Sequence, residues 1–255
     1  MGLPIAAQVY SVREEAAADF EKAMRKLADM GYHGVELAGL YGKSVEEIRA
    51  CLERAGLEAI SAHVPIDEFE KDLDKTVQTY KEIGCKYVVV PYLSQDRWYG
   101  GSQYADTLKT ISRISEKCHQ VGMELLYHNH HFEFQTTPEG AYQLDAFYDT
   151  IPSEELKTEL DLCWLKVGGA DPVAYLHKYS GRCPVVHVKD FIHKDEEVVL
   201  MAVGEGEVDA QAIVPAAIES GAQWLVIEQD THTYGTPMEN MKKSLEFIKN
   251  CMNHD

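Results

Sequence analysis

The sequence predicts an α/β protein, and three observations narrow this class to a single (β/α)8 barrel. Short apolar runs alternate eight times with segments of helical periodicity, and the links between them are short. No linker rich in Pro, Gly or Ser and no low-complexity tract interrupts the chain. The length of 255 residues is also usual for one such barrel. We therefore expect residues 1–255 to form one domain.

The first half of the chain contains four of the expected strand and helix pairs. The strands are expected at 3–10, 33–37, 57–63 and 86–91. The helices that follow them are expected at 14–30, 44–55, 67–83 and 104–121. Ser44 and Glu47 have the spacing of a capping box, and glycines follow the expected helix ends at 31, 56, 84 and 122.

The second half repeats the pattern four more times. The fifth strand is the apolar run that begins at Leu125 and breaks into polar residues at His128. The remaining strands are expected at 158–161, 185–189 and 224–228. The helices are expected at 138–151, 172–179, 209–219 and 237–251. Asp171 and Pro172 are a typical cap and first residue of a helix, and a longer loop is expected after 189.

The charge balance argues against two classes of partner. Acidic residues outnumber basic residues 42 to 24, which gives a formal net charge of −18. Such a field repels both nucleic acids and anionic membranes, so we expect neither as a partner. Most of the excess acid lies in helix-like segments and predicts a solvated surface.

The location of the protein is expected to be cytoplasmic. No apolar run reaches about 18 residues, and no charged and then apolar leader precedes the first strand. The six cysteines are scattered and form no CxxC pair. We expect reduced and mostly buried thiols.

Polar side chains follow six of the eight expected strands. They are Glu36, His63, His128 with His130, Asp161, His187 with Lys189, and Glu228. The carboxyl ends of parallel barrel strands meet at one face, and buried polar groups are costly unless they are paired or ligated. The pattern therefore predicts a shared partner, and a divalent cation held by His, Asp, His and Glu fits.

The proposed ligands have simpler alternatives. Asp161 could cap a helix, but its place at the end of an apolar strand rather than before a helix favours a ligand. His187 could be a hydrogen-bonded core histidine, and Glu228 a surface residue at a strand end. His128 and His130 are two residues apart and face the same way, so either could serve.

A second group of residues is expected to bind substrate. Glu36 and His63 have this role or a structural one. Lys189 binds substrate or forms an ion pair with its neighbour Asp190. Glu133 reaches a substrate hydroxyl or faces solvent. His130 and Trp164 are also assigned to the substrate, and Trp164 could stack on the apolar face of a sugar ring.

Seven stretches of the chain resemble the xylose isomerase-like barrels of the sugar phosphate isomerase/epimerase superfamily. They are Gly34–Leu37, Ser61–His63, Tyr127–Phe134, Leu160–Trp164, His187–Asp190, Val203–Asp209 and Ile227–Glu228. They occur in the expected order from the second strand to the eighth. The superfamily contains inosose dehydratases, the branch that this chain resembles, and, distantly, metal-dependent apurinic endonucleases. The resemblance implies a TIM barrel that acts on a small carbohydrate.

The resemblance also implies one divalent metal ion at the mouth of the barrel. Carried over to this sequence, its ligands are His128, Asp161, His187 and Glu228. Manganese is the first expectation, and Co, Zn, Fe and Mg are alternatives. The register of the superfamily favours His128 over His130 as the ligand from the fifth strand.

One departure from the superfamily pattern bears on the reaction. Many of its epimerases have a glutamate at the position of His128, and epimerisation uses two carboxylates on opposite sides of the substrate. Here Glu228 is the ligand carboxylate suited to be the base. Lys189 could protonate a departing oxygen, and a neutral imidazole at His128 could also move protons.

The expected function is a divalent-metal-dependent sugar isomerase or epimerase that removes a proton next to a carbonyl. The first alternative is a metal-dependent dehydratase or lyase that acts on an inosose or a 3-keto-glycoside by β-elimination. The second alternative is a sugar-binding barrel without turnover. An apurinic endonuclease fits the negative charge poorly. The sequence leaves open the substrate, the metal, the choice between isomerisation and elimination, and the oligomeric state.

Overall fold

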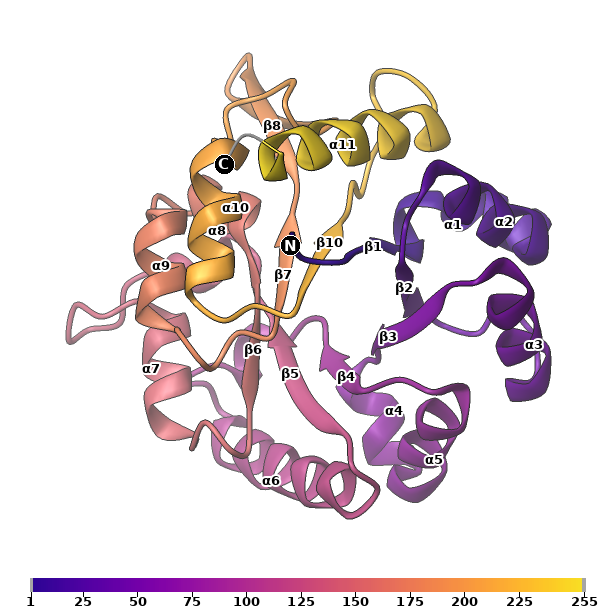
Figure 1. Cartoon of the computed structure of the whole chain (residues 1–255). Helices are drawn as coiled ribbons and strands as arrows, with labels where there is room; N and C mark the ends of the chain where they lie inside the picture. The colour runs from indigo at the N-terminus through magenta and orange to yellow at the C-terminus, as the bar shows by residue number, and fades with distance from the viewer. Residues whose placement is uncertain (1, 254–255) are drawn as a thin grey trace.

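The computed structural model describes residues 2–253 and contains a closed barrel of parallel strands (Figure 1). The strands are β1 (Ile5–Gln8), β2 (Gly34–Ala38), β3 (Glu58–His63), β4 (Tyr87–Val90), β5 (Glu124–His128), β6 (Lys157–Asp161), β7 (Val185–Val188) and β10 (Trp224–Ile227). Each of the strands β1 to β6 pairs with the next one in the chain, β7 pairs with β10, and β10 closes the barrel against β1. The predicted (β/α)8 barrel is confirmed.

Helices surround the strands on the outside of the barrel (Figure 1). The α-helices are α1 (Arg13–Ala18), α2 (Phe20–Met30), α3 (Val45–Ala55), α4 (Ile66–Lys71), α5 (Leu73–Ile83), α6 (Tyr104–Gln120), α7 (Gln143–Thr150), α8 (Leu162–Val167), α9 (Pro172–Lys178), α10 (Ala210–Glu219) and α11 (Pro237–Met252). Three short 3-10 helices are η1 (Val9–Val12), η2 (Gln95–Arg97) and η3 (Phe132–Phe134). Each longer helix buries one apolar stripe; in α2, for example, Phe20, Met24 and Leu27 are buried.

Two helices that were predicted as continuous are each broken by an aspartate. Asp19 separates α1 from α2, and Asp72 separates α4 from α5. Both residues have extended backbones, with φ of −158° and −159°, and each side chain accepts the backbone N–H three residues later. The break therefore starts a new capped helix, which a pattern of apolar residues does not reveal. The helix expected at 138–151 begins only at Gln143, after a turn closed by a bridge between Thr136 and Tyr142.

The longer loop expected after β7 is instead a β-hairpin. Its antiparallel strands are β8 (Asp190–Lys194) and β9 (Glu197–Met201). The turn residues Asp195 and Glu196 both have positive φ, at 51° and 68°. Such two-residue turns favour Asn and Gly, so an Asp-Glu turn carries little sequence signal.

A buried carboxylate anchors this hairpin to the segment that follows it. Asp190 Oδ1 accepts the backbone N–H groups of Phe191 and Val208, and Oδ2 accepts those of Gly204 and Gly206. The distances are 2.8 to 3.0 Å. A side chain at Gly206 would place its Cβ 2.3 Å from Asp190 Oδ1, so glycine is required there. Asp190 thus binds backbone amides and not Lys189, which corrects the ion pair considered from the sequence.

Two further expectations concern the whole chain. All six cysteines are unpaired, and five of them are buried, as expected from their scattered spacing. Within residues 2–253, no helix combines the length and the apolar character that crossing a membrane would require.

Candidate metal centre

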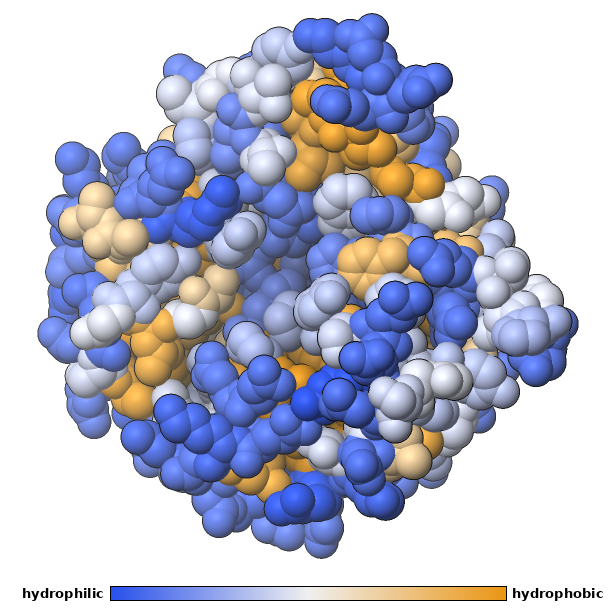
Figure 2. All heavy atoms as spheres, turned by 180° about the vertical axis from the view of Figure 1, so that it is seen from behind, coloured by the Kyte–Doolittle hydropathy of each residue, from blue (hydrophilic) through white to orange (hydrophobic). Residues whose placement is uncertain are grey.

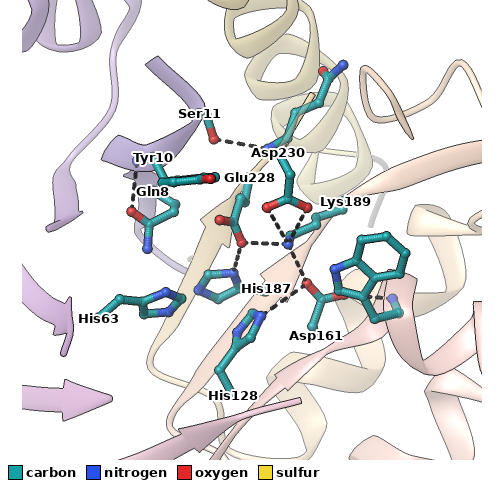
Figure 3. A network of polar contacts seen from close by, with 12 residues as sticks. Gln8, Tyr10, Ser11, His63, His128, Asp161, His187, Lys189, Glu228 and Asp230 are labelled. Atoms are coloured by element: carbon teal, nitrogen blue, oxygen red, sulfur yellow. Dashed lines mark hydrogen bonds and ion pairs between the residues drawn. The ribbon is translucent and has the colours of Figure 1, made fainter. Parts of the chain in front are cut away.

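Simple alternation along the strands places the candidate residues at one end of the barrel interior. A separate apolar cluster consists only of barrel-strand residues, among them Leu126, Val185 and Val226. The residues two positions further along these strands are His128, His187 and Glu228. Side chains two positions apart lie on the same side of a strand, so these three also point into the barrel. Figure 3 shows them converging with Asp161.

The four predicted ligands form one compact group. Ligand atoms of His128, Asp161, His187 and Glu228 all lie within 4.8 Å of one another, and all four residues are buried. His187 Nδ1 lies 2.9 Å from Glu228 Oε2, and His128 Nε2 lies 3.7 Å from Asp161 Oδ2. Asp161 Oδ2 is buried and has no hydrogen-bond partner, and its nearest cation is the Lys189 ammonium at 3.1 Å. A buried carboxylate oxygen in a mixed nitrogen and oxygen donor set fits a divalent transition metal.

Asp161 caps a helix, which was the alternative to its predicted role as a ligand, and the cap leaves one of its oxygens available. It ends β6, and its Oδ1 accepts the backbone N–H of Trp164 at 2.8 Å as the N-cap of α8. The expectation that no helix follows Asp161 was therefore wrong. Asn129 clamps the same backbone, because its side chain donates to the Asp161 carbonyl and accepts the Asp161 N–H. Capping uses one carboxylate oxygen and leaves Oδ2 directed at the centre.

Glu159 is a buried member of the site that the sequence analysis missed. Its Oε1 lies 3.0 Å from both His128 Nδ1 and His187 Nε2, and 2.8 Å from His63 Nε2. A carboxylate on the outer nitrogen of a histidine fixes the ring and directs the other nitrogen to the centre. Glu159 lies two residues before Asp161 on β6, so strand alternation could have identified it.

Glu36 and His63 complete this layer beneath the ligands. Glu36 Oε1 lies 2.7 Å from His187 Nε2 and 3.0 Å from His63 Nε2. Its carboxylate also accepts from Gln8 Nε2 at 2.8 Å and from Ser61 Oγ at 2.5 Å. Glu36 is fully buried and does not line the cavity, whereas His63 does.

His63 and His128 have opposite protonation states. Burial would lower the pKa of His63, but the carboxylates of Glu36 and Glu159 raise it to about 10. Burial lowers the pKa of His128 to well below its usual range, and the nearby positive charges of His187, His63 and Lys189 add to this effect. His128 is therefore neutral, which is the form that binds a metal.

Lys189 is a buried ammonium among three carboxylates (Figure 3). Its Nζ lies 2.7 Å from Glu228 Oε2, 3.1 Å from Asp161 Oδ2 and 3.0 Å from Asp230 Oδ2. Burial would raise the pKa of Glu228, but Lys189 and His187 hold it below its usual range. The sequence analysis also missed Asp230, although it lies two residues after Glu228 and faces the same way.

A cavity of about 640 Å³ opens above this cluster. It is lined by Tyr10, Ala38, Gly39, His63, Pro65, Glu68, Pro91, Tyr92, His128, His130, Trp164, Lys189, Glu228 and Asp230. The view from behind in Figure 2 shows a face that is hollowed near its centre, with mainly hydrophilic residues around the hollow. Of the residues assigned to substrate, His63, His130, Trp164 and Lys189 therefore lie on the cavity wall.

Glu133 is not on the wall, contrary to both positions considered for it. It is buried in η3 and only 3% exposed. Its carboxylate accepts from the Tyr127 hydroxyl at 2.7 Å and from the His130 backbone N–H at 2.8 Å. Glu133 thus holds the turn that carries His130.

The match to known families is extensive. The family described as xylose isomerase-like TIM barrel matches residues 24–251. The chain belongs to this family. The match begins after β1, and the strands that carry all four clustered residues lie inside it.

The individual proteins that this chain resembles share a quarter or less of its sequence. The inosose dehydratase of Geobacillus kaustophilus is 25% identical over an alignment of length 280. The alignment covers 92% of this chain and 88% of the relative. A sugar phosphate isomerase/epimerase from Parabacteroides distasonis superposes with a TM-score of 0.83 at 22% identity, covering 96% of this chain and 97% of that one. The IOLI protein with a bound zinc atom superposes with a TM-score of 0.75 at 15% identity, covering 98% of each chain. Both solved structures therefore share the fold of this chain.

Proposed function

We propose that this protein is a divalent-metal-dependent lyase. It removes a proton next to the carbonyl of a keto-sugar or keto-inositol and eliminates the oxygen on the adjacent carbon. His128, Asp161, His187 and Glu228 hold the metal, with manganese as the first expectation. When bound, the ion polarises the carbonyl and so acidifies the neighbouring C–H bond.

The observation that carries this proposal is the one-sided distribution of carboxylates on the cavity wall. Glu228 and Asp230 both come from the end of β10, whereas the end of β5 contributes His128 and His130. Epimerisation through two bases needs one on each side of the substrate. The other acidic residue on the wall, Glu68, is exposed at the start of α4 and lies outside the cluster. A single base suffices for elimination.

Glu228 and Lys189 can carry the proton transfers of this reaction. The Glu228 carboxylate takes the proton next to the carbonyl, and the electrons of that C–H bond form the new carbon–carbon double bond. The bond to the oxygen on the adjacent carbon breaks, and the Lys189 ammonium donates a proton to this oxygen, which leaves as water or as an alcohol. Both residues line the cavity, so the proton on Glu228 can afterwards return to Lys189 through solvent in the cavity. Both residues regain their starting states.

The rest of the wall supports a sugar-sized ligand. His63, His130 and Trp164 surround the centre, and Tyr10 and Tyr92, which also line the cavity, are 42% and 52% exposed. Exposed aromatic faces suit the C–H face of a sugar ring, and polar groups between them suit its hydroxyls. The names of the curated relatives, all inosose dehydratases among those most similar, agree with this substrate class.

Isomerisation or epimerisation is the second candidate. It is favoured by the fold similarity to a sugar phosphate isomerase/epimerase and by the position of His128, whose neutral ring could serve as the opposite proton carrier. A sugar-binding barrel without turnover is the third. All three share the same metal and the same cavity.

A substrate panel in deuterated water separates these candidates. Protein loaded with Mn²⁺ is incubated with keto-sugars, inososes and 3-keto-glycosides, and the products are analysed by NMR and mass spectrometry. We expect the wild type to release water or an alcohol from its substrate. We expect Glu228→Gln to lack this activity. Deuterium in an unchanged carbon skeleton would instead establish isomerisation or epimerisation. Binding without either change across the panel would support the barrel without turnover.

A further inference from the structure

Lys189 contacts the same carboxylate oxygens that the proposed metal centre uses. One oxygen of Asp161 is engaged by the backbone N–H of Trp164, so only Oδ2 faces the centre, 3.1 Å from Lys189 Nζ. Glu228 Oε2 lies 2.7 Å from Nζ and 2.9 Å from His187 Nδ1. The ammonium therefore contacts an oxygen of each carboxylate in the proposed ligand set.

Asp230 is the third partner of Lys189, and it differs from the other two. Both of its oxygens lie near Nζ, at 3.0 and 3.3 Å. Its side chain is 27% exposed, compared with 0% for Asp161 and 3% for Glu228. It lines the cavity and is not part of the ligand group. Arg13 Nη1 donates to its carbonyl at 2.9 Å and fixes its backbone.

Charge repulsion makes the three contacts unequal once a divalent cation is bound. Two positive charges that share buried oxygens repel strongly, because burial weakens solvent screening. The ammonium can keep a partner by shifting toward Asp230, whose carboxylate lies outside the ligand set. This shift moves Nζ from the buried ligands toward the cavity wall.

We propose that Asp230 is a positioning residue that takes over the Lys189 ammonium when the cation binds. It thereby holds Nζ at the cavity, where it can donate to an oxygen of the substrate. This inference rests on the metal centre of the proposed function. It adds that the lysine competes with the cation and that Asp230 relieves the competition.

A double-mutant cycle on cation affinity tests the proposal without any assay of turnover. Chelator-treated full-length protein is titrated with Mn²⁺ by calorimetry for the wild type, Lys189→Met, Asp230→Asn and the double variant. We expect Lys189→Met to bind Mn²⁺ about tenfold more tightly than the wild type, and Asp230→Asn about tenfold more weakly. Effects of this size are typical of the coupling between residues in contact. In the Lys189→Met background, Asp230→Asn should change affinity by no more than about threefold. Equal effects of Asp230→Asn in both backgrounds, or weaker binding by Lys189→Met, would overturn the proposal.

A measurement on the unsubstituted protein covers the case in which Lys189→Met does not fold. Acetylation of lysines is followed by mass spectrometry with and without Mn²⁺. Lys189 is 1% exposed, and we expect its labelling to rise severalfold with the cation, whereas exposed Lys26 stays unchanged. Unchanged labelling of Lys189 in cation-loaded protein would refute the shift. If the wild type binds no divalent cation at all, the proposed metal centre itself fails, which calorimetry reports separately.

Discussion

The residue that most distinguishes this site is His128, because its partner beneath is a carboxylate. Its Nδ1 lies 3.0 Å from Glu159 Oε1, and both side chains are buried. A glutamate at position 128 would face Glu159 with a second negative charge. The histidine and Glu159 therefore form a matched pair.

This pairing gives a prediction about stability. His128→Glu should destabilise the protein by about 3 kcal/mol, because it leaves two buried carboxylates in contact. Adding Glu159→Gln should recover at least half of that loss, since a neutral amide can donate to the new carboxylate. Urea denaturation of the four members of the cycle measures both effects. Equal destabilisation with and without Glu159→Gln would contradict the pairing.

A second residue-scale property is the buried acid of η3. Burial raises the pKa of Glu133 to about 7, above the value near 4.5 of an exposed glutamate. A carboxyl whose pKa is raised by folding favours the folded state at low pH, and this advantage is lost as the pH rises through about 7.

Glu133→Gln isolates this effect. Relative to the wild type, the variant should gain about 2 to 3 kcal/mol of unfolding free energy between pH 5 and pH 8, at 1.36 kcal/mol for each unit of pKa difference. Urea denaturation of both proteins at the two pH values gives the difference directly. Parallel stability curves would show that Glu133 keeps an ordinary pKa in the folded protein.

At the scale of elements, the β8–β9 hairpin depends on a single side chain. Asp190 satisfies four backbone N–H groups, three of them in the stretch from Gly204 to Val208. Gly206 allows the backbone to approach the carboxylate, because a Cβ there would lie 2.3 Å from Asp190 Oδ1.

Asp190→Ala should therefore be strongly destabilising. Buried amides left without an acceptor cost about 1 to 3 kcal/mol each, and partial access of water should limit the total to about 3 to 5 kcal/mol. Chemical denaturation measures the loss, and hydrogen exchange should accelerate first at Gly204, Gly206 and Val208. Glu197→Ala, which removes an exposed carboxylate from the same hairpin, is the control and should stay within about 0.5 kcal/mol of the wild type.

At the scale of the whole molecule, the barrel brings five carboxylates to one end, four of them buried and one partly exposed. They are Glu36, Glu159, Asp161, Glu228 and Asp230, in a chain whose net charge is already −18. Lys189 and the protonated His63 offset part of this charge. A divalent cation would offset more, so cation binding and global stability should be coupled.

Chelator-treated protein should accordingly gain about 2.7 kcal/mol of stability when Mn²⁺ is present at 100 times its dissociation constant. Asp161→Asn should abolish most of this gain, because the amide keeps an acceptor for the α8 cap but binds a metal poorly. Thermal unfolding with and without Mn²⁺ tests the pair, with exposed Asp149→Asn as the control. A gain that survives Asp161→Asn would place the cation elsewhere.

The periodic pattern of the whole chain predicted more of the structure than single local signals did. Strand and helix periodicity predicted the barrel, and the polar strand ends predicted that His128, Asp161, His187 and Glu228 would gather. Local signals failed at the Asp19 and Asp72 caps and at the hairpin, where single side chains and turn dihedrals decide the structure.

Periodicities of two and 3.6 residues along the chain are enough to predict the barrel and the inward direction of its strand ends. The partners that meet across the barrel depend on strand register, which these periodicities do not contain. Glu159 faces His128 because β5 and β6 pair in that register, and Lys189 reaches Asp230 because β10 ends beside β7. These contacts join residues 31 and 41 positions apart, and the pairing of neighbouring strands, not the local pattern, sets their distance.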